Sequence, residues 1–218
     1  MRILTAAAAA GIAMGGWAVV TVRELPEYYV AGQRYTIEFQ VRQHGRTLLS
    51  GLEPHVIVST SPRRLGGLLG GDNETNIVAR PATGEGAYSA TFTAPAGERL
   101  FLSIESGFRD NAVRLYPAPI VRAGSSRAAM TAAERGQVLF VAKGCNVCHL
   151  NGDLVDRPDN LSMPVGPDLS GHRLAREYVI QKIKHPASQV MPDLGLSDGE
   201  ANAIASFLTN ERTAAAGR

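Results

Sequence analysis

The stretch Cys145-Asn146-Val147-Cys148-His149 decides how this sequence of 218 residues is interpreted. The chain has two cysteines, and both lie in this stretch, three positions apart, with a histidine directly after the second. Cys-x-x-Cys-His is the motif for covalent attachment of a c-type haem. Two thiols at this spacing can form thioether bonds to the two vinyl groups of one porphyrin, and the adjacent imidazole reaches the iron. We therefore predict one covalent haem c on Cys145 and Cys148, with His149 as an axial ligand.

Three other uses of the two cysteines have less support. A zinc module of the four-cysteine class needs more cysteines than the chain contains. A thioredoxin-like redox pair is expected in a βαβ context and has no need of His149. A disulfide across two residues stays open as an alternative, but it does not require the sequence that flanks the motif.

Helical patterns surround the motif. Capping boxes, in which Thr or Ser is followed three residues later by Glu, predict helices that start at Thr131 and Ser197. The first of these helices is expected to end at Gly144, just before the motif. A middle helix over residues 176–184 is expected to end before Pro186.

The order of these features resembles the class I c-type cytochromes. The order is helix, Cys-x-x-Cys-His, Gly-Pro-Asp-Leu at 166–169, helix, Met-Pro at 191–192, helix. The resemblance implies an all-α class I cytochrome c domain over residues 131–213. It also implies that the first and last helices cross, with Gly136 and Phe140 meeting the face around Phe207.

The same resemblance implies two further roles at the iron. The backbone carbonyl of Pro167 orients His149, and the methionine of the pair Met191-Pro192 is the sixth ligand. The chemistry of the residue agrees, because a thioether is a soft ligand that suits haem iron and His/Met ligation raises the potential. An open sixth position is the other possibility, and other side chains that remain as alternatives are Met163, His172 and His185.

The first half of the chain has the pattern of β-strands. Apolar and polar residues alternate strictly over 35–42, which is typical of a half-buried strand. Further strands are predicted at 17–22, 55–59, 76–79, 88–93, 100–104 and 113–116, and Tyr116-Pro117-Ala118-Pro119 is expected to end the pattern. This number of short strands predicts an all-β immunoglobulin-like sandwich over residues 19–122, followed by a linker over 123–130. The half resembles the immunoglobulin-like domains appended to exported bacterial redox proteins.

No chemistry is evident in this β-rich half. Single histidines such as His44 and His55 are more typical of surfaces and hydrogen bonds than of metal sites. The glycine-rich stretch 66–71 lacks the Gly-Lys-Ser/Thr ending of a phosphate-binding loop, so a hairpin loop is the better interpretation.

Residues 1–18 are predicted to be a signal peptide or an N-terminal anchor. A basic residue at position 2 precedes an uncharged stretch of small and apolar residues that runs to Val22. The protein is therefore expected in the periplasm or on the outer face of the cytoplasmic membrane, with possible membrane association through this segment or a complex. A net charge of +2 gives no reason to expect a nucleic-acid partner.

These features together predict an electron carrier rather than an enzyme. The expected partners are redox proteins, an unknown donor and an unknown acceptor, docked through the β-domain. The alternatives are a haem-relay subunit of a membrane respiratory or photosynthetic complex and a haem sensor or enzyme with an open sixth position. Basic residues that could form a docking rim are Lys143, Arg173, Arg176, Lys182 and Lys184.

Overall fold

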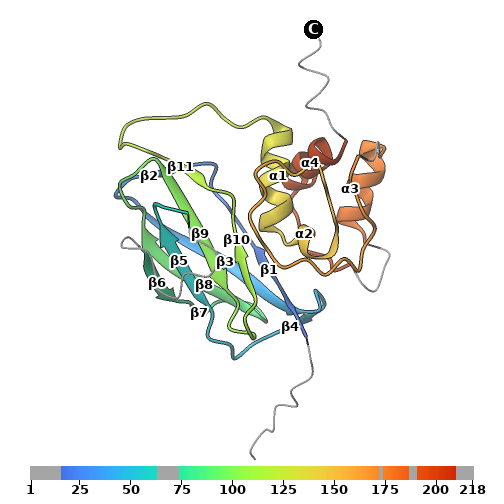
Figure 1. The fold of residues 1–218 in the computed structure, drawn as a ribbon, viewed down its shortest axis with the longest axis horizontal. Coiled ribbons are helices and arrows are strands. Elements are labelled where there is room, and N and C mark those ends of the chain that lie inside the picture. The colour runs from blue at the N-terminus through green and yellow to red at the C-terminus, as the bar shows by residue number, and fades with distance from the viewer. Residues whose placement is uncertain (1–15, 63–73, 172–173, 187–190, 210–218) are drawn as a thin grey trace, which may run out of the picture.

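The protein divides into a β-rich first half and a helical second half (Figure 1). The computed structural model describes residues 16–62, 74–171, 174–186 and 191–209. The strands are β1 (Ala18–Val22), β2 (Tyr29–Val30), β3 (Arg34–Gln43), β4 (Thr47–Leu48), β5 (His55–Ser59), β6 (Thr75–Val78), β7 (Arg80–Pro81), β8 (Ala87–Thr93), β9 (Arg99–Glu105), β10 (Ala112–Arg114) and β11 (Ala118–Val121). The helices are α1 (Ala132–Ala142), α2 (Cys145–Cys148), α3 (Arg176–Lys184) and α4 (Asp198–Leu208).

The strands form two sheets, which we call together the β-domain. One sheet has the order β1-β3-β8-β7, with β4 paired to β3, and the other has the order β2-β11-β9-β5-β6, with β10 paired to β9. Strand pairs are antiparallel except β2 with β11, which is parallel. Apolar side chains from both sheets share one core, whose largest members include Tyr29, Phe39, Tyr88, Leu100 and Ile104.

The alternating pattern over 35–42 does form the expected strand. In β3 the side chains of Ile37, Phe39 and Val41 are buried, and those between them are more exposed. This is the period of two that places every second side chain on one face of a sheet. The immunoglobulin-like classification and the boundaries at 18, 122 and 130 remain predictions.

The expectation that the strand pattern ends at residues 116–119 is wrong, because β11 lies there. Ala118 and Pro119 pair with β9, whereas Ile120 and Val121 pair with β2. Proline has no backbone N–H, so it cannot donate a hydrogen bond to a neighbouring strand. Here the strand changes partner directly after Pro119, so the missing donor is tolerated.

The helices begin where the capping boxes predict. The side chains of Thr131 and Ser197 accept hydrogen bonds from the N3 amides of α1 and α4, and the N3 glutamates close both boxes. The two helices cross closely, because a Cβ on Gly136 would lie 1.9 Å from the carbonyl oxygen of Ala203. Phe140 and Phe207 contact each other edge to face, with ring centroids 5.7 Å apart. The implied crossing of the first and last helices is therefore present.

Within the part of the chain that the structure describes, no helix has the length and apolar character needed to cross a membrane.

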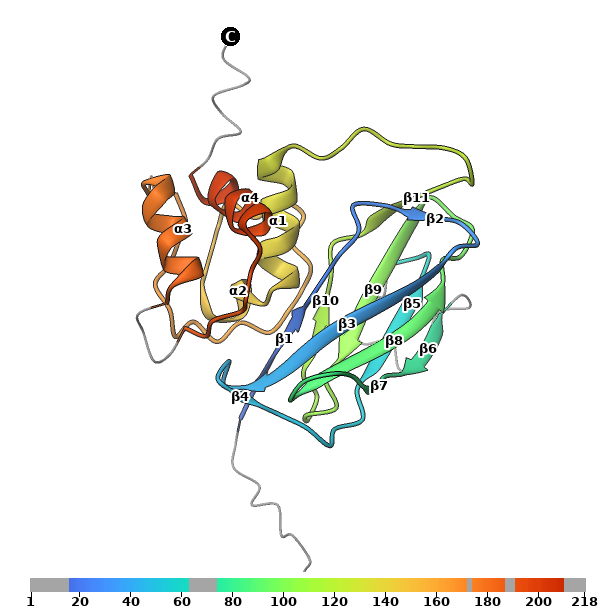
Figure 2. The same ribbon diagram turned by 180° about the vertical axis from the view of Figure 1, so that it is seen from behind.

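The β-domain and the helical region are in direct contact along β1 (Figure 2). A Cβ on Gly144 would lie 2.4 Å from Val19 Cγ1 and 2.9 Å from the carbonyl oxygen of Val20. The hydroxyl of Thr21 donates to the carbonyl of Lys143 at 3.3 Å. Strand β1 therefore runs against the residues that immediately precede the haem motif.

Candidate haem site

The two cysteines occupy a single helical turn. Helix α2 starts with Cys145 and ends with Cys148, and residues three apart on a helix lie on the same face. Gly144 precedes the turn with a φ of 78°, a left-handed conformation that favours glycine. The two thiols are thereby presented together, as attachment to one planar group requires.

Neither cysteine has the properties of a reactive thiol. Both are free of disulfide bonds in the structure. Burial, with a smaller effect of the neighbouring Cys148, raises the pKa of Cys145 to about 12. Burial also raises the pKa of Cys148. A redox-active cysteine needs a stabilised thiolate, so these environments do not favour a thioredoxin-like pair.

Of the two ring nitrogens of His149, only Nδ1 has a hydrogen-bond partner among the described residues. Its Nδ1 lies 2.9 Å from the carbonyl oxygen of Pro167, the contact implied by the cytochrome resemblance. Among the described residues, Nε2 makes no hydrogen bond. A carbonyl bound to one ring nitrogen fixes the tautomer and leaves the other nitrogen available for a metal.

The loop at 163–169 forms a cradle for this imidazole. Backbone amides of Met163, Gly166 and Leu169 donate to the carbonyls of residues 147, 148 and 150 at 2.7–2.9 Å. A Cβ on Gly166 would stand 2.5 Å from His149 Cε1 and 2.7 Å from Nδ1. Only glycine therefore allows this loop to pass so close to the ring.

Met191 lies outside this group of contacts. It is half-buried and begins the segment that leads into α4. No hydrogen bond or ring contact joins it to the motif within the described residues. The alternative ligand Met163 is 37 % exposed and belongs to the loop on the His149 side. His185 is exposed at the end of α3, and His172 lies outside the described residues.

Apolar side chains surround the motif inside the helical region. Leu139, Phe140, Val179, Ile204 and Phe207 are buried in one cluster. The side chains expected to form a haem wall are partly buried against this cluster, namely Leu169, Ile180, Ile183 and Leu194, whereas Val190 lies outside the described residues.

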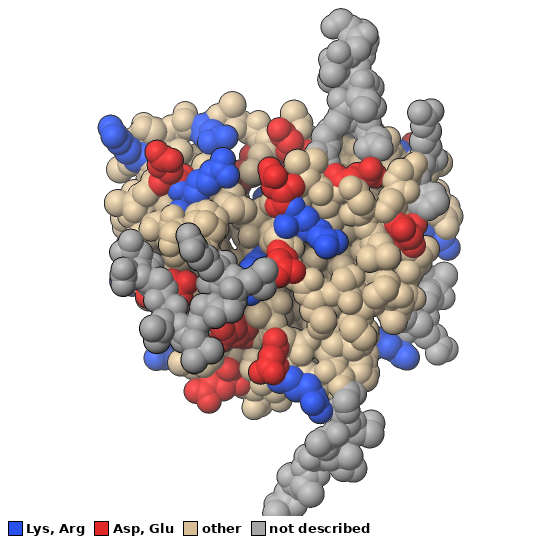
Figure 3. All heavy atoms as spheres, in the orientation of Figure 1, with Lys and Arg blue, Asp and Glu red and all other residues tan. Residues whose placement is uncertain are grey.

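Three of the residues that could form a basic docking rim make local contacts. Lys143 is buried, because its ammonium forms an ion pair with Glu200 and donates to the carbonyl of Arg23. Arg176 donates to Ser206 and Asn202, and Lys184 pairs with Asp198. Acidic and basic side chains are interspersed on the face shown in Figure 3. Arg173 lies outside the described residues.

The histidines of the β-domain have ordinary local partners. The His55 Nδ1 lies 2.8 Å from Asn76 Oδ1, and the His44 ring contacts Trp17. No group of three or more His, Cys, Asp or Glu side chains that could hold a metal ion occurs among the described residues. The stretch 66–71 lies outside those residues.

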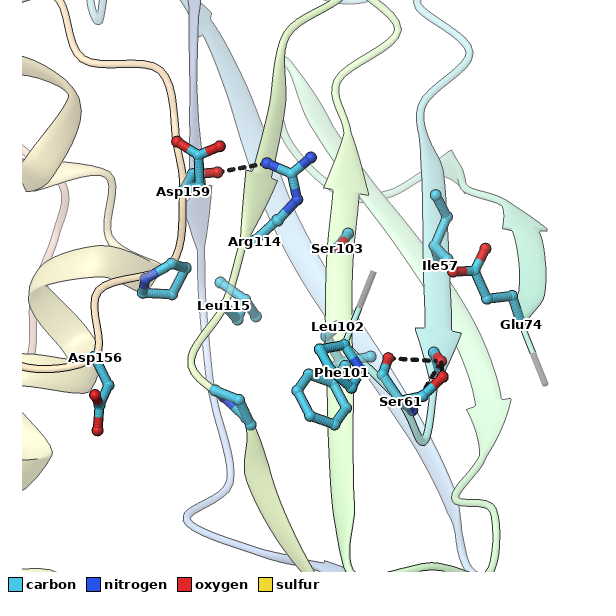
Figure 4. Close-up of a pocket in the computed structure, with 14 residues that line it drawn as sticks. Ile57, Ser61, Glu74, Phe101, Leu102, Ser103, Arg114, Leu115, Asp156 and Asp159 are labelled. Atoms are coloured by element: carbon cyan, nitrogen blue, oxygen red, sulfur yellow. Dashed lines mark hydrogen bonds between the residues drawn. The ribbon is translucent and has the colours of Figure 1, made fainter. Parts of the chain in front are cut away.

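A cavity of about 240 Å³ lies between the β-domain and the segment 156–159 (Figure 4). Its floor comes from β5, β9 and β10, and Arg114 donates across it to the carbonyl of Asp159. The backbone amide and carbonyl of Arg114 also bond the side chain of Asn160, at 2.7 and 2.9 Å. The cavity contains no residue of the haem motif and marks a second contact between the two regions.

Sequence reasoning missed what the β-domain contributes to the site. The tip of the β3–β4 hairpin lies beside Cys148, and β1 packs closely against Gly144. No local signal marks such contacts, because they join segments that are far apart in the chain.

The residues present fit a covalent haem. Two thiols share one helical turn, a histidine has one nitrogen fixed and one unpartnered among the described residues, and a glycine leaves room for the imidazole. Apolar side chains line the region, as a porphyrin ring requires.

Comparison with protein families gives a match in the helical half of the chain. The model of the family described as cytochrome C oxidase, cbb3-type, subunit III matches residues 131–208. A search of curated proteins finds no match. The matched range includes all four helices and the motif and leaves out the β-domain. The match supports a c-type cytochrome domain at the C-terminal end of the chain, with haem as its cofactor and electron transfer as its chemistry.

Proposed function

We propose that the protein is an electron carrier with one haem c, which is bonded to Cys145 and Cys148 and ligated by His149 and Met191. When bound, the haem supplies an iron that takes up and releases one electron. The single observation that carries the proposal is the geometry of His149, whose Nδ1 is fixed by Pro167 and whose Nε2 is unpartnered among the described residues.

Each residue has a defined task in this proposal. The thiols of Cys145 and Cys148 fix the cofactor, and the Pro167 carbonyl keeps the imidazole of His149 in one tautomer. Met191 fills the sixth position, so that no small molecule binds the iron. Its half-buried place on a segment separate from the His149 loop agrees with a ligand on the opposite side of a flat group.

We also propose that redox partners dock through the β-domain. The contacts of β1 and of Arg114 fix the β-domain to the helical region, so a partner bound to it would stand at a set position relative to the haem. The proposed location is the periplasm or the outer face of the cytoplasmic membrane.

The family match favours a second candidate function. The family is named for subunit III of an oxidase, so the protein can be a haem-relay subunit of a respiratory complex. Comigration of the native protein with a large oxidoreductase would favour the subunit, and a monomer in the soluble fraction would favour the free carrier.

Optical spectroscopy of the reduced and oxidised protein tests the ligands. His/Met ligation predicts the weak near-infrared band of Met-ligated ferric haem and no reaction of the reduced protein with carbon monoxide. Met191→Ala is expected to lose the band and to bind carbon monoxide, whereas Met163→Ala is the matched control that keeps wild-type behaviour. Prompt binding of carbon monoxide by the wild type would contradict the proposal and would favour a sensor or enzyme.

A further inference from the structure

The tip of the β3–β4 hairpin lies beside the second cysteine of the motif. Gly45, at this tip, is buried and has a φ of 71°. A Cβ placed on Gly45 would stand 3.9 Å from Cys148 Sγ, 3.6 Å from Val19 Cγ2 and 4.0 Å from Trp17 Cη2. The hairpin tip therefore lies beside the thiol, at a separation that one added methyl group would span.

Two aromatic rings lie together at the hairpin tip. The ring centroids of Trp17 and His44 are 5.6 Å apart, and the amide of His44 donates to the carbonyl of Trp17 at 2.9 Å. Trp17 is half-buried and His44 is exposed. Trp17 is therefore a neighbour of both His44 and Gly45.

The other end of the motif has the same support. Gly144, directly before Cys145, packs on Val19 and Val20 so closely that a Cβ would overlap with both. Thr21 holds the carbonyl of Lys143. Strand β1 and the hairpin thus contact the attachment segment at both of its ends, which fixes the hairpin tip in place.

From these contacts we propose that Trp17 and residues 43–45 form a wall of the haem site, which excludes water from the haem edge bonded to Cys148 and raises the reduction potential. Ferric haem carries one more positive charge than ferrous haem, so a dry, apolar boundary favours the ferrous form. Solvent access around a metal site sets its potential in this way. The β-domain would then be part of the redox centre as well as a docking module. The inference rests on the proposed function, because it needs a thioether at Cys148.

A pair of glycine variants tests the wall. Gly45 and Gly51 have similar backbone conformations, with φ of 71° and 75°, a region that asparagine tolerates better than most residues. Nothing lies within 4 Å of a Cβ on Gly51, whereas Gly45 faces Cys148, Val19 and Trp17. In Gly45→Asn the added Cβ meets its neighbours at van der Waals distances, and the polar amide beyond it is placed in the wall. We expect a negative shift of the midpoint potential in Gly45→Asn and the wild-type potential in Gly51→Asn.

A second pair opens the wall without crowding it. Trp17→Ala removes the ring that covers the tip, and Arg46→Ala changes an exposed side chain of the same hairpin. We expect the midpoint potential to fall in Trp17→Ala and to be unchanged in Arg46→Ala. If Gly45→Asn does not fold, this second pair tests the wall in its place. If both Gly45→Asn and Trp17→Ala carry covalent haem and keep the wild-type potential, the proposed wall is wrong, whereas the proposed function is unaffected. Absence of covalent haem from the wild-type protein would instead overturn the proposed function.

Discussion

Lys143 and Glu200 form an ion pair of 2.5 Å between the end of α1 and the start of α4. The Lys143 side chain is 4 % exposed and that of Glu200 is 20 % exposed. The same ammonium donates to the carbonyl of Arg23, which lies just beyond β1. One buried cation therefore joins both helices to the β-domain, next to the haem motif.

We predict that Lys143→Met destabilises the protein substantially. Removing one partner of a buried pair leaves the other charge uncompensated, which costs about 3 kcal/mol. The matched control is Lys184→Met, because Lys184 pairs with Asp198 at the surface and exposed pairs contribute little. Urea denaturation of both variants measures the difference. Equal stabilities of the two variants would contradict the structural role of Lys143.

The ion pair also predicts a dependence of stability on pH. Burial raises the pKa of Glu200, but hydrogen bonds from Lys143 and from the backbone of Ser197 outweigh it, so the pKa lies below its ordinary value of 4.5. A carboxyl group with a lowered folded-state pKa stabilises the fold above pH 4.5, and this contribution is lost as the pH falls through the folded-state pKa.

Glu200→Gln removes this contribution and keeps the capping box. We therefore expect a constant difference in the free energy of unfolding between wild type and variant above pH 4.5, and a shrinking difference below it. Glu134→Gln makes the same change in the capping box of α1 and serves as the control. If the difference in the free energy of unfolding between wild type and Glu200→Gln grows on acidification, the folded-state pKa of Glu200 is not lowered.

Gly136 is predicted to be essential for the crossing of α1 and α4. A Cβ there would lie 1.9 Å from the carbonyl oxygen and 2.6 Å from the carbonyl carbon of Ala203, and backbone atoms cannot move aside. Gly136→Ala should therefore cost about 3 kcal/mol or more. Gly199→Ala has nothing within 4 Å of the new methyl group and should not destabilise α4. Thermal melting followed by circular dichroism compares the two, and a normal melting temperature for Gly136→Ala would refute the close packing.

Gly166 is predicted to control the axial histidine. An added methyl group would stand 2.5 Å from His149 Cε1, so the ring must turn and its contact with Pro167 must break. We expect Gly166→Ala to shift the Soret band and to weaken iron ligation by His149. Gly152→Ala meets only the side chain of Ser170, at 3.3 Å, and should keep the wild-type spectrum. Identical spectra for the two variants would mean that the loop at 163–169 does not position the ligand.

Local signals predicted most of the longer elements of both halves. The capping residues Thr131 and Ser197 predict the starts of α1 and α4, and the alternation around Phe39 predicts β3. These signals work because they depend on residues that are neighbours in the chain. Strand β11 was missed because Pro119 is a strong local signal against a strand, and a change of pairing partner overrides it.

Contacts between distant segments could not be predicted. The local sequence around Lys143 is that of an exposed lysine near the end of a helix. Only the fold shows that this side chain is buried, with Glu200 and the carbonyl of Arg23 as its partners. The motif identified Cys145, Cys148 and His149, but nothing local indicated that Gly45 and Val19 lie against it. The share of the β-domain in the site is therefore a result of tertiary structure.

We propose that both cysteines hold one haem. Mass spectrometry of the intact protein in denaturing solvent tests this attachment, because a covalent cofactor stays with the unfolded chain. We expect the mass of the polypeptide plus one haem, and a single remaining thioether in Cys145→Ser and in Cys148→Ser. A wild-type mass equal to that of the polypeptide alone, from cells able to attach c-type haem, would contradict it.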